Sequence, residues 1–265
     1  MIPSIELYPI LFFLFGSIVG SFLNVVIWRV PRNESIIAPP SHCPSCNTHI
    51  APYDNIPMLS WLILGGKCRQ CKQEISSRYF IVEFITGLLT VLMVSTYGIS
   101  NELYINLILV YMLIAITYID FDHYIIPNEF ILMGIGVVFA AHVFEWLPIT
   151  IMEGVYGALT FGGFLFGIGQ VGSLILKKDS MGFGDVKLGL VLGGLLGLEL
   201  AVLALFLSFI ISALFTLVGV TLFKMEGKGK IPFGPFMAAA TVVVFLTRTA
   251  GGGNSILNWY FTTMF

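Results

Sequence analysis

Long apolar stretches, separated by short polar segments, follow one another along almost the whole chain. A helix needs about 20 apolar residues to cross the hydrocarbon core of a bilayer, and most of these stretches approach that length. We therefore predict membrane-spanning helices near residues 8–28, 79–97, 103–120, 128–147, 151–176, 184–198, 199–223 and 232–248. The stretch at 184–198 is short and rich in glycine, so seven crossings are an alternative to eight.

The composition favours an all-α polytopic membrane protein. Hydrophobic residues make up 57% of the chain and charged residues only 11%, whereas soluble domains carry roughly 25% charged residues. The balance of 13 basic and 15 acidic residues leaves no basic surplus for a phosphate backbone, so nucleic acid is not an expected partner. Glu6, not a basic segment, precedes the first apolar stretch, which we expect to remain as an anchor among the lipids.

The distribution of positive charge predicts how the helices are oriented. With eight crossings, every lysine and arginine except Arg248 falls in segments on one side. Positive side chains near span ends are retained on the cytoplasmic side of the membrane. We therefore expect both termini outside and the large polar segment, residues 29–78, in the cytoplasm. The predicted parts are a first transmembrane helix (1–28), a cytoplasmic insert (29–78) and a transmembrane bundle (79–265).

Two cysteine pairs in the insert predict a structural zinc site. Cys43 and Cys46 form one C-x-x-C motif, Cys68 and Cys71 form a second, and residues 47–67 separate the two. This spacing lets two tight turns present four thiolates to one Zn²⁺ ion. Four thiolates leave no coordination position for water, and a segment of about 50 residues needs such a staple to fold. Free or transiently oxidised thiols are the alternative.

Ionisable residues within or beside membrane spans are candidates for function, because burying one at the bilayer centre costs about 2.5–3.5 kcal/mol on insertion scales. The candidates are Glu83, Asp120, Asp122, Glu129, Glu153, Asp185 and Glu199. Two of them stand in unusual local sequence. Asp120 ends a span seven residues before Pro127, and Asp185 follows Gly182-Phe183-Gly184 directly.

Asp120 and Asp185 are both expected at the cytoplasmic edge of the membrane, where they can meet. Two carboxylates about 3 Å apart do not both ionise easily, so they share a proton. One can then accept a proton from water while the other donates a proton to a peptide carbonyl. The alternative is that both aspartates only cap or flank helix ends, which is a common use of this residue.

Six segments in this order resemble the type IV prepilin peptidases, which are membrane aspartyl proteases with a Gly-x-Gly-Asp motif. The segments are Gly20 to Arg29, Cys43 to Cys71, Ser77 to Glu83, Asp120 to Asn128, Gly182 to Gly189 and Ile231 to Phe236. Together they extend over nearly the whole chain. In this comparison Asp120 and Asp185 match the catalytic aspartates, and Asp122 is the weaker choice because the essential position lies seven residues before the proline.

The resemblance implies a bifunctional enzyme of the bacterial inner membrane. Such an enzyme cleaves the basic leader of prepilins or secretion pseudopilins after glycine, then methylates the new N-terminus with S-adenosylmethionine. The methyltransferase half rests on the resemblance alone, because no G-x-G-x-x-G motif follows a strand. Asn24, Arg29 and Glu83 are candidates for cofactor binding, although Asn24 and Glu83 can instead pair with each other.

Other interpretations remain for several of these features. A protease without methyl transfer is one rival, and an ion-coupled transporter relaying ions through Asp120, Glu153 and Asp185 is another. The segment Pro232-Phe233-Gly234-Pro235 lines the mouth of the active site or is an ordinary helix start. Gly16 and Gly20 are expected to allow close helix packing.

Overall fold

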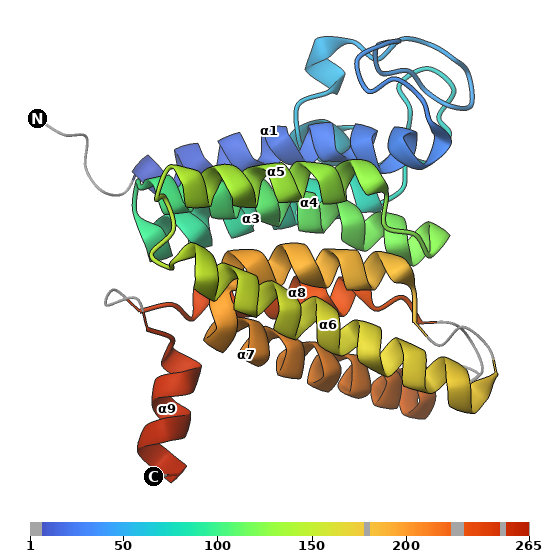
Figure 1. Cartoon of the computed structure of the whole chain (residues 1–265). Helices are drawn as coiled ribbons and strands as arrows, with labels where there is room; N and C mark the ends of the chain where they lie inside the picture. Colours follow the sequence, from blue (N-terminus) through green and yellow to red (C-terminus); the bar gives the residue numbers. More distant parts are fainter. Residues whose placement is uncertain (1–6, 178–180, 224–230, 250–252, 265) are drawn as a thin grey trace, which may run out of the picture. The chain divides into compact units, whose positions relative to one another are not determined.

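The computed structural model describes residues 7–177, 181–223, 231–249 and 253–264. Helices dominate this part of the chain, and it contains no β-strand. The α-helices are α1 (Leu7–Arg29), α2 (Leu59–Ile63), α3 (Arg78–Tyr97), α4 (Asn101–His123), α5 (Asn128–Val143), α6 (Ile151–Leu176), α7 (Phe183–Phe223), α8 (Gly234–Leu246) and α9 (Ser255–Met264), shown in Figure 1. Two short 3₁₀ helices are η1 (Val30–Arg32) and η2 (Pro52–Asp54). The predicted all-α fold is confirmed.

Five of these helices, α1, α3, α4, α6 and α7, are long and apolar enough to cross a membrane. The chain is a multi-pass membrane protein, and the exact number of crossings stays a prediction. Helix α7 contains a break at Gly197, whose φ of 73° and ψ of 175° are not helical. Figure 1 shows the two parts of α7 running in opposite directions, in lighter and darker orange. The predicted separation into 184–198 and 199–223 therefore corresponds to a helical hairpin that turns at Gly197.

One helix end and one additional helix differ from the predicted pattern. We expected α5 to extend to residue 147, but it ends at Val143 because Glu145 adopts a left-handed conformation and the Trp146 amide bonds back to the Ala141 carbonyl. This arrangement terminates a helix even where the side chains stay apolar. The short helix α9 was not predicted.

Four of the lysines that contribute to the predicted orientation lie outside the described residues. They are Lys178, Lys224, Lys228 and Lys230.

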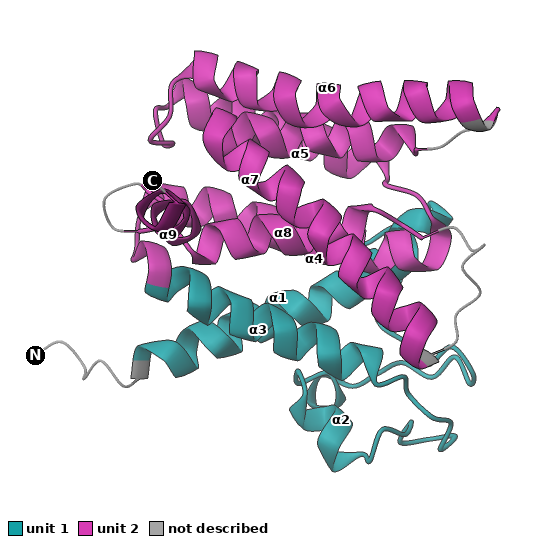
Figure 2. Cartoon of the chain, turned by 90° about the horizontal axis from the view of Figure 1, so that it is seen from below, with its two compact units in different colours: residues 1–95 teal, residues 96–265 magenta. Residues whose placement is uncertain are grey.

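The chain divides into two compact units, residues 1–95 and residues 96–265, which Figure 2 colours separately. In the first unit, α1 packs closely on α3. A methyl group at Gly20 would lie 2.7 Å from the Glu83 Cα atom, and one at Gly16 would lie 2.8 Å from the Thr86 carbonyl oxygen. The predicted close packing at Gly16 and Gly20 is thereby confirmed. The insert connects α1 to α3.

In the second unit, α4 is the central helix. In the 18-residue apolar stretch of α4, 67% is buried, compared with 17% in the corresponding stretch of α6. Helix α8 contacts both α4 and α7, and α6 runs along α7 (Figure 1). Gly157 and Gly193 allow the backbones of α6 and α7 to touch, because a methyl group at Gly193 would lie 2.8 Å from the Ala158 Cα atom. Tight backbone packing thus holds α6 against the first part of α7, which carries Asp185 near its start.

Candidate functional site

Asp120 lies near the end of α4 and is 5% exposed. The helix ends three residues later, because Tyr124 adopts a left-handed conformation while its amide donates to the Asp120 carbonyl oxygen at 2.9 Å. The side chain has a different partner. The amide of Gly234, the first residue of α8, donates a hydrogen bond to Asp120 Oδ2 at 3.1 Å. The start of α8 therefore fixes one carboxylate oxygen of Asp120.

Asp185 is the third residue of α7 and is partly buried. Its carboxylate lies beside Gly182, where a methyl group would be 3.1 Å from Asp185 Oδ2. Ile126 links the surroundings of the two aspartates, because it packs against Gly184, next to Asp185, and against Gly234, which binds Asp120. Among the hydrogen bonds of the described residues, none joins the two carboxyl groups directly. The structure thus places both aspartates at the same end of the second unit.

Ile126 connects the two sides of this site. It lies in the α4–α5 connection, and its side chain packs against two glycines. A methyl group at Gly184 would be 3.1 Å from Ile126 Cβ, and one at Gly234 would be 3.3 Å from Ile126 Cδ1. Gly184 precedes Asp185, while Gly234 holds Asp120. The contacts of Ile126 therefore help to set the separation between the two carboxyl groups.

The segment Pro232-Phe233-Gly234-Pro235 was predicted to line the active-site mouth or to start a helix. In the structure Gly234 starts α8 and its amide reaches Asp120, whereas no sequence pattern pointed to Ile126. The proline that follows Gly234 marks a helix start, whose amides have no partner inside the helix. Local motifs do not identify the distant acceptor that such an amide binds. Phenylalanines also surround this end, with the rings of Phe121 and Phe215 6.4 Å apart and those of Phe215 and Phe236 5.2 Å apart. They provide an apolar surface beside Asp120.

Asp122 and Glu153 are two further charged candidates. Asp122 is exposed. Glu153 belongs to a capping box at the start of α6, in which its carboxylate accepts from the Thr150 amide at 2.7 Å and its own amide donates to the Thr150 hydroxyl. This use in capping explains its position at a helix end without any role in ion transport.

The four cysteines form one cluster in the first unit. The sulfur atoms of Cys43, Cys46, Cys68 and Cys71 all lie within 4.8 Å of one another, and the Cys43 and Cys71 sulfurs are 3.8 Å apart. Zinc–sulfur bonds of about 2.3 Å in a tetrahedron place the sulfurs about 3.8 Å apart. The donor set and its spacing therefore fit a metal ion of this kind.

The two C-x-x-C turns have the same backbone geometry. Cys43 donates to the Thr48 carbonyl at 3.0 Å, and Cys68 donates to the Gln73 carbonyl at 2.8 Å. In each turn the residue after the second cysteine has a positive φ, 55° at Asn47 and 60° at Lys72. Each turn is thus shaped by its own local hydrogen bonds.

Hydrogen bonds and an ion pair lie beside the cysteine cluster. Hydrogen bonds with the Thr48 side chain and backbone lower the pKa of Cys46 to about 6, which favours the thiolate that a metal binds. Arg69 binds Asp54 through two hydrogen bonds, from Nε at 2.8 Å and from Nη2 at 2.6 Å. The hydrogen bond from Arg69 holds the pKa of Asp54 below its usual value. This ion pair ties η2 to the second cysteine turn.

The candidates for cofactor binding are all buried, and backbone groups bond each of them. Asn24 Nδ2 donates to the Tyr79 carbonyl at 3.2 Å, and Glu83 Oε2 accepts from the Met58 amide at 2.6 Å. The expected alternative that Asn24 and Glu83 pair with each other is wrong, because their partners differ. Arg29 donates to the carbonyls of Ser35 and Pro39. Asn24 joins α1 to α3, whereas Arg29 and Glu83 hold the insert against these helices, and their part in cofactor binding stays a prediction.

The comparisons with known proteins agree with this organisation. Residues 14–97 match the family described as the bacterial peptidase A24 N-terminal domain, and residues 107–217 match the type IV leader peptidase family. The two matched segments fall in the two compact units, apart from the last residues of the first. No solved structure matches the chain.

Curated relatives are similar over most of their length. The prepilin leader peptidase/N-methyltransferase of Aeromonas hydrophila is 35% identical, over 97% of this chain and 94% of that protein. The protein of the same name in Bacillus subtilis (strain 168) is 33% identical, over 94% of this chain and 96% of that protein. The type 4 prepilin-like proteins leader peptide-processing enzyme of Escherichia coli O78:H11 is 36% identical, over 87% and 90%. On this evidence of similarity across both units, the chain belongs to the type IV leader peptidase family.

Proposed function

We propose that this protein is a bifunctional prepilin peptidase and N-methyltransferase, with Asp120 and Asp185 as its catalytic aspartates. The observation that carries the proposal is the meeting of four helix ends around these residues. Gly234 at the start of α8 binds Asp120, and Ile126 packs against both Gly184 and Gly234. The relatives named for this activity favour it over the ion-transporter alternative.

Peptide hydrolysis needs a base for water and an acid for the carbonyl group. One aspartate takes a proton from the water oxygen, which attacks the carbonyl carbon of the scissile bond, while the other protonates the carbonyl oxygen. Collapse of the tetrahedral intermediate then breaks the carbon–nitrogen bond, and the leaving nitrogen takes a proton from the pair. The bond from Gly234 keeps one oxygen of Asp120 oriented throughout.

The position of the site at a helix-end boundary suits the proposed substrate. A prepilin or pseudopilin has a basic leader followed by an apolar helix. We place the site and the insert on the cytoplasmic face of the bacterial inner membrane, where the leader stays in water and the apolar helix stays among lipids. The phenylalanines beside Asp120 offer an apolar surface for the start of that helix. Cleavage at this depth requires no extraction of the helix from the bilayer.

The insert would hold zinc and serve the methyl transfer. Cys43, Cys46, Cys68 and Cys71 would bind one Zn²⁺ ion, which stabilises the insert and leaves no site for metal catalysis. S-Adenosylmethionine, when bound, supplies a methyl group to the new terminal amine, as the carbon–sulfur bond of the sulfonium breaks and the amine loses a proton. The insert, the first transmembrane helix and the bundle from residue 79 remain our proposed functional division.

The test is cleavage of a purified prepilin by the detergent-solubilised protein, with methyl incorporation measured separately. Asp120→Asn and Asp185→Asn are expected to abolish cleavage. Asp122→Asn, at an exposed position in the same helix, serves as the matched control and is expected to retain it. Full cleavage by either of the first two variants would overturn the assignment of the catalytic pair.

A further inference from the structure

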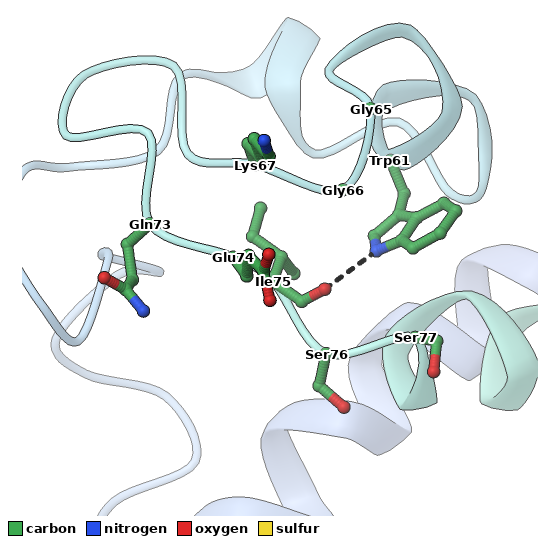
Figure 3. Close-up of a pocket in the computed structure, with 9 residues that line it drawn as sticks. All are labelled: Trp61, Gly65, Gly66, Lys67, Gln73, Glu74, Ile75, Ser76 and Ser77. Atoms are coloured by element: carbon green, nitrogen blue, oxygen red, sulfur yellow. Dashed lines mark hydrogen bonds between the residues drawn. The ribbon is translucent and has the colours of Figure 1, made fainter.

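A hollow of about 610 Å³ lies in the insert, beside the second cysteine turn. Figure 3 shows it between Trp61 on one side and the hairpin of residues 65–77. Its volume falls within the range of roughly 300–1,000 Å³ that is typical of small-molecule sites. The hairpin is closed by bonds from the Ile75 amide to the Gly66 carbonyl and from the Cys68 amide to the Gln73 carbonyl. The wall of the hollow and the second cysteine turn are therefore one structure.

The Trp61 ring is fixed in this wall. Its Nε1–H donates to the Ile75 carbonyl oxygen at 3.2 Å, drawn as a dashed line in Figure 3. The Phe80 ring packs 5.5 Å away, centroid to centroid. Gly66 is buried with a φ of 66°, and a methyl group there would lie 3.0 Å from Trp61 Cζ2. An indole held in this way is a platform on which a flat heterocycle can stack without any loss of side-chain freedom.

Two opposite charges stand next to each other at the same hollow. Lys67 and Glu74 face each other as an antiparallel bridge pair, and both are exposed. No ion pair joins them within the described residues, and neither has another polar side-chain partner there. An unpaired ammonium beside an unpaired carboxylate is complementary to a zwitterion, whose carboxylate and ammonium groups it would bind. The hydroxyl of Ser77 adds a further polar group to the lining.

We propose that this hollow, the Trp61 hollow, binds the methyl donor S-adenosylmethionine. The donor joins a flat purine to an α-amino acid zwitterion, and these two parts match the fixed indole and the Lys67–Glu74 pair. The inference rests on the methyltransferase half of the proposed function and places the donor away from Asn24, Arg29 and Glu83. It also connects the cysteine cluster with methyl transfer, because the second cysteine turn shapes the wall of the hollow.

The experiment uses the full-length, zinc-loaded protein in detergent and measures its equilibrium binding of radiolabelled S-adenosylmethionine. Lys67→Gln and Glu74→Gln each remove one charge from the hollow. We expect each to weaken binding about tenfold, which corresponds to the loss of one modest charge-assisted contact. Lys72→Gln and Glu34→Gln remove the same charges from exposed positions of the insert outside the hollow, and they are expected to bind as the wild type does.

Tryptophan fluorescence supplies a second readout that a purely structural role would not change. The chain has four tryptophans, and the donor is expected to alter the emission of Trp61. Trp61→Phe keeps an aromatic platform, so it should retain binding while losing this fluorescence change. Trp61→Leu should weaken the binding itself. Zinc content and thermal unfolding of each variant establish that the insert is folded.

The outcomes separate this inference from the proposed function. If the wild type methylates its cleaved substrate while Lys67→Gln and Glu74→Gln bind the donor normally, the Trp61 hollow is not the site. A fluorescence change that persists in Trp61→Phe has the same meaning. If the wild type cleaves prepilin but neither binds the donor nor transfers a methyl group, the methyltransferase function fails, and this inference fails with it.

Discussion

A single added methyl group at Gly234 tests the geometry of the proposed protease site. The Cβ atom of Gly234→Ala would lie 2.7 Å from Asp120 Oδ2 and 3.3 Å from Ile126 Cδ1. Since carbon–oxygen contacts are rarely closer than about 3.3 Å, the carboxylate must move by roughly 0.6 Å. Displacing a reacting group by about 1 Å can lower a rate on the order of 100-fold. We therefore expect kcat/KM for cleavage to fall by roughly tenfold to a hundredfold.

The assay compares cleavage rates with thermal unfolding of the same preparations. Crowding at a packed site typically costs about 1–3 kcal/mol of stability, so some decrease in Tm is expected as well. Gly136→Ala in α5 is the matched control, because a methyl group at Gly136 would meet no atom within 4 Å. It should cleave at the wild-type rate. If folded Gly234→Ala also cleaves at that rate, Asp120 does not act from the position seen here.

Three further changes test other parts of the structure. Ile126→Ala removes the side chain between the two aspartate-bearing helix ends. We expect the cleavage rate to fall in protein that is still folded by its Tm; an unchanged rate would show that Ile126 does not set the separation of the two carboxyl groups. Gly193→Ala would drive a methyl group into the backbone of Gly157 and should cost about 3 kcal/mol of stability, measured as a lower Tm against Gly136→Ala. Cys43→Ser should lower the zinc content measured by atomic absorption, and an unchanged content would refute a four-cysteine site.

The helices and the cysteine cluster could be predicted from the sequence because both depend on local patterns. Apolar length marks a span, and C-x-x-C spacing shapes each cysteine turn without help from distant residues. The turn in α7 was also close to its predicted place, since Gly197 permits the positive φ that the turn needs. The end of α5 was not predicted correctly, because apolar residues continue past Glu145 while the backbone there is no longer helical.

The contacts that build the candidate site could not be predicted in the same way. The bond between Asp120 and Gly234 joins residues 114 positions apart in the sequence. It uses a backbone amide, which every residue except proline possesses, so the residue type at position 234 does not identify the partner of that amide. The Ile126 side chain is likewise an ordinary apolar residue. Its importance comes from the two glycines that three-dimensional packing brings against it.

The matching backbone geometry of the two cysteine turns has a consequence for how the protein matures. Since each turn is shaped by its own hydrogen bonds, the proposed zinc ion would add mainly the closure of the segment between them. Closing a loop of this size by a crosslink typically contributes about 3 kcal/mol in the entropic model. Unlike a disulfide, such a crosslink forms under reducing conditions and opens when a chelator removes the ion. If the cysteines bind zinc as proposed, insertion of the helices into the membrane and closure of the insert would be separate events, and metal supply would control only the second.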